Sequence, residues 1–312
     1  MRSAIMFSGQ GSQNPGMGKE LYDDQAVFRD IFDRADLALD FSVTTMCFGD
    51  DPRLNETQYA QPCILAHSIA CYELLKSKGF NGDVFLGLSL GEYTALTAAG
   101  VFGFAEALRL VRKRGIFISE ACATGDGGMS AIMGLSPELA EKACFDASDD
   151  RDLVSCANFN TPGQIVIAGS VNALGKAEKL CLDYGAKRAL RLNVSGPFHT
   201  EYLRPAANKL KTELAKLKLG SPGKPVISNL TAREISGDII NNLIKHMVSP
   251  VRFEESVNYL ISQGVDTFIE LGPGKTLCSF VKKINKNLRI LNIEDNASLE
   301  NTLSLLGSDY EK

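Results

Sequence analysis

Three positions in the sequence carry residue types suited to nucleophilic catalysis. The first is Ser89, in the segment FLGLSLGEYTALTAAG (85–100), which reads as a strand, a sharp turn and a helix of small residues. A serine between Gly87 and Gly91 on a strand-to-helix turn is typical of a nucleophile whose hydroxyl is held exposed. The same glycines would also serve a strand and a helix that only cross closely, so the motif alone leaves both interpretations open.

A nucleophilic serine needs a base, and the chain has three histidines. His67 lies among apolar residues of a predicted helix, which favours a structural role on a packed helix surface. His246 precedes MVSPVRF near a predicted helix end, where its side chain could cap carbonyl groups. His199 follows NVSGP on a loop where a small subdomain would return the chain to the larger one, and such loops often carry function. We therefore expect His199 to be the base.

An acidic third member of the site is not expected. In α/β-hydrolases the acid follows the nucleophile and precedes the histidine. Here the intervening acids nearly all fall in the predicted small subdomain or its turns: Asp126, Asp146, Asp149, Asp150, Asp152 and Asp183. We interpret the pair Ser89 and His199 as a dyad whose imidazole is oriented by a main-chain carbonyl.

The third position is Arg114, which falls inside the apolar stripe of the helix predicted for 104–122. A buried arginine needs an anion, because an unpaired buried charge is costly. That anion is either an internal carboxylate or the carboxylate of a substrate held by the guanidinium fork. The helical wheel leaves these two interpretations equal.

The glycine-rich loop GQGSQ (9–13) lacks the spacing of a phosphate-binding loop. A main-chain N–H of this loop could instead stabilise an oxyanion. The second donor would be the N–H of Leu90, directly after the nucleophile.

Predicted strands and helices alternate over most of the chain, which indicates a mostly parallel sheet covered on both faces. The predicted elements of the first part are strands at 3–9 and 83–89 and helices at 24–39, 62–77, 90–99 and 104–122. From 129 to 194 the order is instead βαββαβ, typical of a ferredoxin-like unit. The α/β pattern then resumes with a helix to about 217, a strand at 226–229, a helix to about 247, a strand at 267–272 and a further helix.

The composition is that of an ordinary globular protein, with 45% hydrophobic residues, 22% charged residues and a net charge of −4. This charge does not favour nucleic-acid binding. The eight cysteines never fall at C-x-x-C spacing and lie among apolar neighbours, so we expect reduced thiols and no metal site. The N-terminal apolar run is too short for a signal peptide, and no stretch is long enough to span a membrane. We expect a cytoplasmic protein.

Together these segments resemble the malonyl-coenzyme A:acyl carrier protein transacylases and the acyltransferase domains of polyketide synthases. The matching motifs are FSGQGSQNPGMG (7–18), TQYAQPCIL (57–65), GLSLGEYTAL (87–96), VRKRG (111–115), NFNTPGQIVIAG (158–169), VSGPFHT (194–200), SPVRF (249–253) and ELGPGKTL (270–277). The resemblance implies an α/β-hydrolase-like catalytic subdomain, discontinuous at 1–124 and 197–312, with a ferredoxin-like subdomain inserted at 125–196.

The resemblance also implies the role of each site residue. Ser89 would be the nucleophile, His199 the base and Arg114 the fork for the malonyl carboxylate, while the main-chain N–H groups of Gln10 and Leu90 would form the oxyanion hole.

Further residues would complete the site by the same resemblance. Gln61 and Asn160 would line the cleft, and Phe198 would favour malonyl over branched acyl groups. The main-chain carbonyl of His246 would orient the catalytic histidine. Two positions depart from the family pattern, since Leu88 replaces the usual histidine before the nucleophile and His246 replaces a usual glutamine.

The implied activity is transfer of a malonyl group from malonyl-coenzyme A to the phosphopantetheine thiol of acyl carrier protein, through a malonyl-serine and without a cofactor. Lys187 and Arg188 could meet the acidic carrier protein. We expect a monomer that binds neither nucleic acid nor membranes. The alternatives are a serine esterase or thioesterase, a trans-acting acyltransferase of a polyketide synthase, and an inert carrier-protein-binding module.

Overall fold

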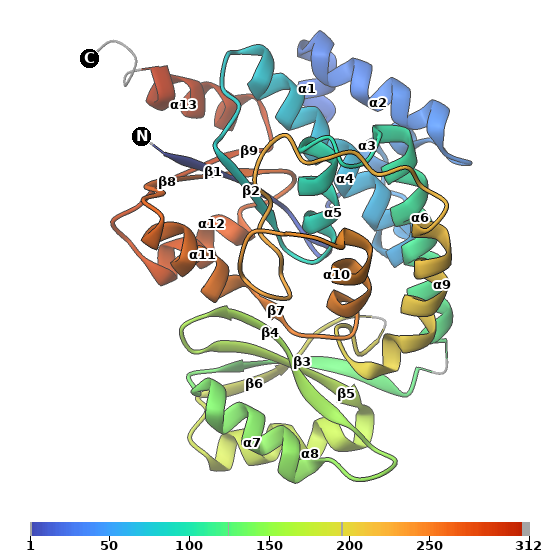
Figure 1. Ribbon diagram of the computed structural model, residues 1–312, viewed down its shortest axis with the longest axis vertical. Helices are drawn as coiled ribbons and strands as arrows, with labels where there is room; N and C mark the ends of the chain where they lie inside the picture. Colours follow the sequence, from blue (N-terminus) through green and yellow to red (C-terminus); the bar gives the residue numbers. More distant parts are fainter. Residues whose placement is uncertain (1, 124, 195, 308–312) are drawn as a thin grey trace. The chain divides into compact units, whose positions relative to one another are not determined.

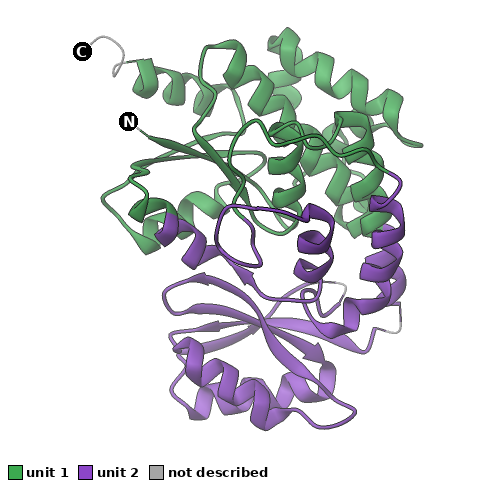
Figure 2. Ribbon diagram, viewed as in Figure 1, with its two compact units in different colours: residues 1–115, 217–227, 260–312 green, residues 116–216, 228–259 purple. Residues whose placement is uncertain are grey.

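The structure, a computed structural model, describes residues 2–123, 125–194 and 196–307. The chain divides into two compact units (Figure 2). The first unit comprises residues 1–115, 217–227 and 260–312, and the second unit comprises residues 116–216 and 228–259. The domain limits predicted from the sequence, 1–124 with 197–312 and 125–196, stay a prediction, and their ends at 1, 124 and 312 lie outside the described residues.

A parallel sheet forms the centre of the first unit (Figure 1). Its described strands lie in the order β2 (Val84–Gly87), β1 (Ser3–Phe7), β8 (Thr267–Leu271) and β9 (Arg289–Ile293). All residues of β1 and β8 are buried, as expected for parallel strands covered on both faces. The register pairs Phe7 with both Gly87 and Leu271, so the carboxyl ends of these three strands meet at one edge.

Helices of the first unit surround this sheet. Its described helices are α1 (Lys19–Asp24), α2 (Ala26–Ala38), α3 (Val43–Phe48), the 3₁₀ turn η1 (Pro52–Asn55), α4 (Thr57–Ser77), α5 (Leu90–Ala98), α12 (Thr276–Ile284) and α13 (Asn296–Gly307). Helix α5 packs on β2 and α4, so the residues after β2 are held between the sheet and a second helix. Two helices run from one unit into the other, namely α6 (Phe104–Ala121) and α11 (Phe253–Ser262).

The second unit contains the predicted βαββαβ order. Its elements are β3 (Gly127–Met133), α7 (Pro137–Ala147), β4 (Val154–Thr161), β5 (Gln164–Ser170), α8 (Val171–Asp183) and β6 (Arg188–Arg191). The sheet order is β6-β3-β5-β4, antiparallel throughout, and β7 (Val251–Arg252) adds a short parallel strand beside β4. The predicted fold class, an α/β core with an inserted small subdomain, is confirmed.

The two faces of this second sheet have different partners. Helices α7 and α8 pack side by side on one face, where Ile132, Cys156 and Ile167 belong to the buried core (Figure 1). On the other face a smaller cluster, Met129, Ala157, Val166 and Ala168, contacts Val194 and Phe198. The remaining elements of this unit are the 3₁₀ turn η2 (Glu201–Leu203), α9 (Arg204–Leu214) and α10 (Ile239–His246).

One predicted strand, at 226–229, is reduced to an isolated bridge. Val226 pairs in parallel with Phe85, whose N–H donates to the Pro225 carbonyl and whose carbonyl accepts from the Ile227 N–H. The N–H of Ser228 donates instead to the carbonyl of Arg233, which turns the chain away from β2. The prediction of a strand was therefore wrong beyond Ile227.

Candidate active site

Ser89 lies on a strained turn between β2 and α5. Its backbone has φ 54° and ψ −99°, a conformation that residues other than glycine rarely adopt. Strain of this kind is often found at functional residues. A Cβ atom at Gly87 would lie 2.1 Å from the carbonyl carbon of Gly91, and one at Gly91 would lie 2.2 Å from the carbonyl oxygen of Phe7. The two glycines therefore allow α5 to pass very close to the ends of β1 and β2. This close approach forces Ser89, between the two glycines, into its unusual conformation.

The loop after β1 lies against this turn, because β1 and β2 are neighbours and end together. A Cβ atom at Gly9 would lie 2.6 Å from the carbonyl oxygen of Leu88. The next residue is Gln10, and the first residue of α5 is Leu90. Neither main-chain N–H of these two residues donates to an acceptor among the described residues. Both N–H groups can therefore donate to a ligand.

Arg114 is buried beside the serine, with only 3% of its surface exposed. Its Nη2 donates to Ser89 Oγ at 3.2 Å, and its Nη1 donates to Gln61 Oε1 at 2.8 Å. The guanidinium lies over the ring of Tyr93, 5.1 Å from the centroid. Burial raises the pKa of Tyr93 to about 12, so this ring stays neutral beneath the cation.

No carboxylate forms an ion pair with Arg114 within the part of the chain that the structure describes. The Nε atom of this side chain is also buried there without a hydrogen-bond acceptor. A buried guanidinium whose partners are neutral can still receive a carboxylate, which would supply the missing charge and acceptors.

Two glutamines extend this group of contacts. Gln61 is buried on α4, and its Nε2 donates to Gln10 Oε1 at 3.2 Å. Gln10 Nε2 in turn donates to Thr57 Oγ1 at 3.0 Å, at the start of α4. Ser89, Arg114, Gln61 and Gln10 are thus connected by hydrogen bonds within the first unit.

His199 and His246 form a second group, within the second unit. His199 is 5% exposed and has a φ of 61°, another conformation rare outside glycine. Its Nδ1–H donates to the main-chain carbonyl of His246 at 3.1 Å. This bond places the proton of the neutral imidazole on Nδ1 and leaves Nε2 as the basic nitrogen. The two rings stack with centroids 5.0 Å apart and 23° between their planes.

Asn160 and Phe198 also lie in the second unit. Asn160 is the seventh residue of β4, and its Oδ1 is buried with no hydrogen-bond donor among the described residues. Phe198 is half-buried against the cluster that contains Met129 and Val166.

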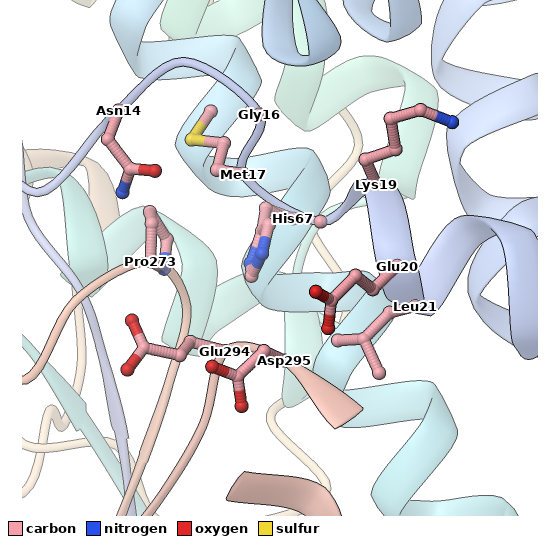
Figure 3. Close-up of a pocket in the computed structure, with 11 residues that line it drawn as sticks. Asn14, Gly16, Met17, Lys19, Glu20, Leu21, His67, Pro273, Glu294 and Asp295 are labelled. Carbon is pink, nitrogen blue, oxygen red and sulfur yellow. The ribbon is translucent and has the colours of Figure 1, made fainter. Parts of the chain in front are cut away.

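His67 has no part in either group. Its ring is completely buried on a packed face of α4, edge-on to the rings of Phe28 and Phe32, in agreement with the structural role expected for it. Burial lowers the pKa of His67 to about 4, which keeps the ring neutral. It lines a separate pocket of about 160 Å³ (Figure 3), together with Asn14, Gly16, Met17, Gly18, Lys19, Glu20, Leu21, Pro273, Glu294 and Asp295.

Sequence reasoning did not select Tyr93, Thr57 or Gly115. A Cβ atom at Gly115 would lie 2.5 Å from Gln58 Cα and 2.7 Å from the Thr57 carbonyl oxygen, so this glycine lets α6 approach the start of α4. The only signal in the sequence was position, since Gly115 directly follows Arg114 and Tyr93 lies one helical turn after Ser89.

The described residues hold no group of three or more His, Cys, Asp or Glu side chains placed to bind a metal ion. All eight cysteines are free thiols. Within the described ranges, no helix combines the length and the apolar character needed to cross a membrane.

The comparisons with known proteins agree on one family. The model of the acyl transferase domain matches residues 5–303. A protein of Bacillus subtilis (strain 168) named malonyl CoA-acyl carrier protein transacylase is 45% identical over 311 residues, covering 99% of this chain and 98% of that protein. The protein of the same name from Escherichia coli (strain K12) is 39% identical over 306 residues, covering 97% and 99%.

Solved structures give the same result. A malonyl CoA-acyl carrier protein transacylase from Clostridium perfringens has a TM-score of 0.96 at 41% identity, covering 99% of this chain and 98% of that one. A second solved structure is that of a type II PKS acyl-carrier protein in complex with its malonyl-transacylase. The chain that matches has a TM-score of 0.94 at 37% identity, and the match covers 97% of this chain and 99% of that one. The resemblance stated from the sequence is confirmed, and the chain belongs to the acyl transferase domain family.

Proposed function

We propose that this chain transfers a malonyl group from malonyl-coenzyme A to the phosphopantetheine thiol of acyl carrier protein, in fatty-acid synthesis. The names of the relatives support this activity. The observation that carries the proposal is the buried guanidinium of Arg114, 3.2 Å from Ser89 Oγ and without a carboxylate partner among the described residues.

The length of the malonyl group fits this distance. One methylene separates its carboxylate from the thioester carbonyl, so a carboxylate bound by Arg114 brings the carbonyl carbon close to the neighbouring Ser89 hydroxyl. An acetyl group lacks the carboxylate and would leave the buried cation unpaired, which disfavours it. The short distance between these two residues therefore supports malonyl as the transferred group.

In the first half-reaction, Ser89 Oγ attacks the thioester carbonyl while its proton passes to His199 Nε2. The main-chain N–H groups of Gln10 and Leu90 donate to the oxyanion of the tetrahedral intermediate. The carbon–sulfur bond then breaks, and the coenzyme A thiolate takes the proton from His199. The product is a malonyl-serine ester.

In the second half-reaction, the phosphopantetheine thiol of the carrier gives its proton to His199 and attacks the ester carbonyl. The carbon–oxygen bond breaks, and Ser89 recovers the proton from His199. Gln61 and Asn160 line the substrate site, and Phe198 limits branching at the malonyl α-carbon. The His246 carbonyl keeps the imidazole oriented through both steps.

The partners follow from this scheme, which needs no cofactor because the carrier supplies the phosphopantetheine. Lys187 and Arg188 are both exposed near β6, and we propose that they attract the acidic carrier. The eight free thiols support a cytoplasmic location. We further propose a monomer without nucleic-acid or membrane partners.

The test is a transfer assay in which the protein is mixed with malonyl-coenzyme A and a phosphopantetheine-loaded carrier. Mass spectrometry would follow malonyl-carrier, and chromatography would follow free malonate. We expect malonyl-carrier to form with little malonate. Release of malonate without carrier loading would identify an esterase or thioesterase instead. A carrier from polyketide synthesis, tested at the same concentration, shows which carrier is preferred.

A further inference from the structure

A single chain of hydrogen bonds connects the buried arginine to the start of α4. Arg114 Nη1 donates to Gln61 Oε1 at 2.8 Å, Gln61 Nε2 donates to Gln10 Oε1 at 3.2 Å, and Gln10 Nε2 donates to Thr57 Oγ1 at 3.0 Å. All four residues lie in the first unit. The last of them, Thr57, has no role in the scheme proposed above.

The direction of this chain is forced by the cation at its end. A guanidinium has only donors, so Gln61 must turn its amide oxygen toward Arg114 and its NH₂ group toward Gln10. Gln10 must then present its own oxygen to Gln61 and its NH₂ group to Thr57. The threonine hydroxyl therefore accepts from Gln10 in this series, and the aligned amides strengthen one another.

Thr57 holds its hydroxyl at a buried and fixed position. It is 3% exposed and is the first residue of α4. Its carbonyl oxygen lies 2.7 Å from where a Cβ atom of Gly115 would be, so the backbones of α4 and α6 are in direct contact there. This contact between α4 and α6 fixes the backbone of Thr57 and, at the neighbouring position on α6, the backbone of Arg114.

We propose that Thr57 is a positioning residue for Arg114, acting through Gln10 and Gln61. The proposal rests on the proposed function, because it gives the arginine its substrate carboxylate. By fixing both glutamines, the Thr57 hydroxyl holds the guanidinium in one orientation before the substrate arrives, which lowers the ordering cost of binding. Loss of the Thr57 hydroxyl should therefore lower the transfer of acyl groups that carry a carboxylate more than the transfer of other acyl groups.

The test is Thr57→Val, which keeps the shape of the side chain and removes the acceptor. Values of kcat/KM would be measured with malonyl- and acetyl-coenzyme A. We expect the malonyl-to-acetyl ratio to fall about 3- to 10-fold, as for one neutral hydrogen bond. Thr57→Ser should restore it. Gln10→Ala removes the hydrogen bond between Gln10 and Gln61 as well as the one to Thr57, and should lower the ratio at least as much.

Two comparisons separate positioning from a general loss of packing. Thr302 is a buried threonine of the same unit whose hydroxyl donates to the Asn292 carbonyl at 2.8 Å, so Thr302→Val is a matched control that should leave the ratio unchanged. In a Gln61→Leu background the chain is already broken, and adding Thr57→Val should change the ratio less than about 2-fold. An additive effect would overturn the proposal.

A measurement without turnover completes the test. Side-chain ¹⁵N NMR of Arg114 should show slow rotation of the guanidinium in the parent protein and faster rotation in Thr57→Val. Equal rotation in both, or an unchanged ratio in an active Thr57→Val, would overturn this inference. If the parent protein transfers no malonyl group, the proposed function fails, and the NMR comparison still decides whether Thr57 orders Arg114.

Discussion

Replacing Arg114 with alanine would remove the buried cation beside the nucleophile. The side chain donates to Gln61 Oε1 at 2.8 Å and to Ser89 Oγ at 3.2 Å, and it lies over the ring of Tyr93. Its main-chain atoms continue α6, so alanine, a good helix former, should preserve the helix. The variant should therefore affect substrate selection more than folding.

The magnitude follows from the burial of the guanidinium. Only 3% of the surface of Arg114 is exposed, so a carboxylate bound to it would also be withdrawn from water. Removing one partner of a buried, hydrogen-bonded ion pair costs about 3–5 kcal/mol. At about 1.4 kcal/mol per factor of ten, malonyl transfer should fall on the order of 10²–10³-fold. Acetyl transfer should stay the same or rise, because an acetyl group leaves no carboxylate unpaired.

The assay would compare kcat/KM for malonyl- and acetyl-coenzyme A with one carrier protein, together with the melting temperature. Arg112→Ala is a matched control on the same helix, since Arg112 contacts Gln58 and stacks on Tyr59. It should leave the malonyl-to-acetyl ratio unchanged. Equal losses with both substrates and a lower melting temperature in Arg114→Ala would refute the reasoning and make this arginine a structural residue.

Three further predictions concern the base, the helix contact and the buried histidine. His199→Ala should lower malonyl transfer by about 10²–10⁴-fold, because the nucleophile loses its proton acceptor. His246→Gln keeps the main-chain carbonyl and should have little effect. If steady-state kinetics show the two effects reversed, His246 and not His199 is the base. Gly115→Ala should lower the free energy of unfolding in urea by about 1–3 kcal/mol and also lower the malonyl-to-acetyl ratio, because its Cβ would lie 2.5 Å from the α4 backbone. The control Gly307→Ala, whose Cβ would meet no described residue within 4 Å, should lower neither. Burial lowers the pKa of His67 from 6.5 to about 4, so between these values the unfolded chain binds more protons than the folded one. The free energy of unfolding should therefore fall by about 3 kcal/mol as the pH drops from 7.5 to 4, and should fall less in His67→Gln. Urea titrations that show the same pH dependence for both proteins would contradict this prediction.

The sequence pattern predicted the strands that carry the site because both are short apolar runs followed by glycine-rich turns. SAIMF and VFLG became β1 and β2, and the helix after the turn begins at Leu90. In the second unit the start of α7 depends on a similarly local signal, since Ser136 Oγ accepts from the Leu139 N–H just ahead of the first turn. These features depend on neighbouring residues, which a sequence shows directly.

Other elements were missed because local signals are weak or conflicting there. Strand β9 begins at Arg289 and follows a run of lysines and asparagines, which reads as a polar surface segment. Strand β7 has only two residues and pairs with β4, a strand about ninety positions earlier. The bridge at Val226 depends likewise on the distant Phe85. Pairing over such separations is not visible in a local pattern.

The residues of the candidate site also divide into those with a local signal in the sequence and those that depend on distant contacts. Arg114 could be found from its place in an apolar stripe, but the stripe could not identify its partners. Those partners, Gln61 and Ser89, come from other elements, and the contact with Gln61 needs the glycine approach at Gly115. Thr57 carried no signal of its own, because a threonine at the start of a helix is common for local reasons.

The measurement that most directly tests the account is mass spectrometry of the intact protein after brief exposure to malonyl-coenzyme A without a carrier. We predict a mass increase of one malonyl group, located by peptide mapping on Ser89, that disappears when a phosphopantetheine-loaded carrier is added. The Ser89→Ala variant, with a melting temperature close to that of the parent protein, should form no adduct. An adduct on another residue, an adduct that persists in Ser89→Ala, or malonyl transfer by that variant would contradict the account.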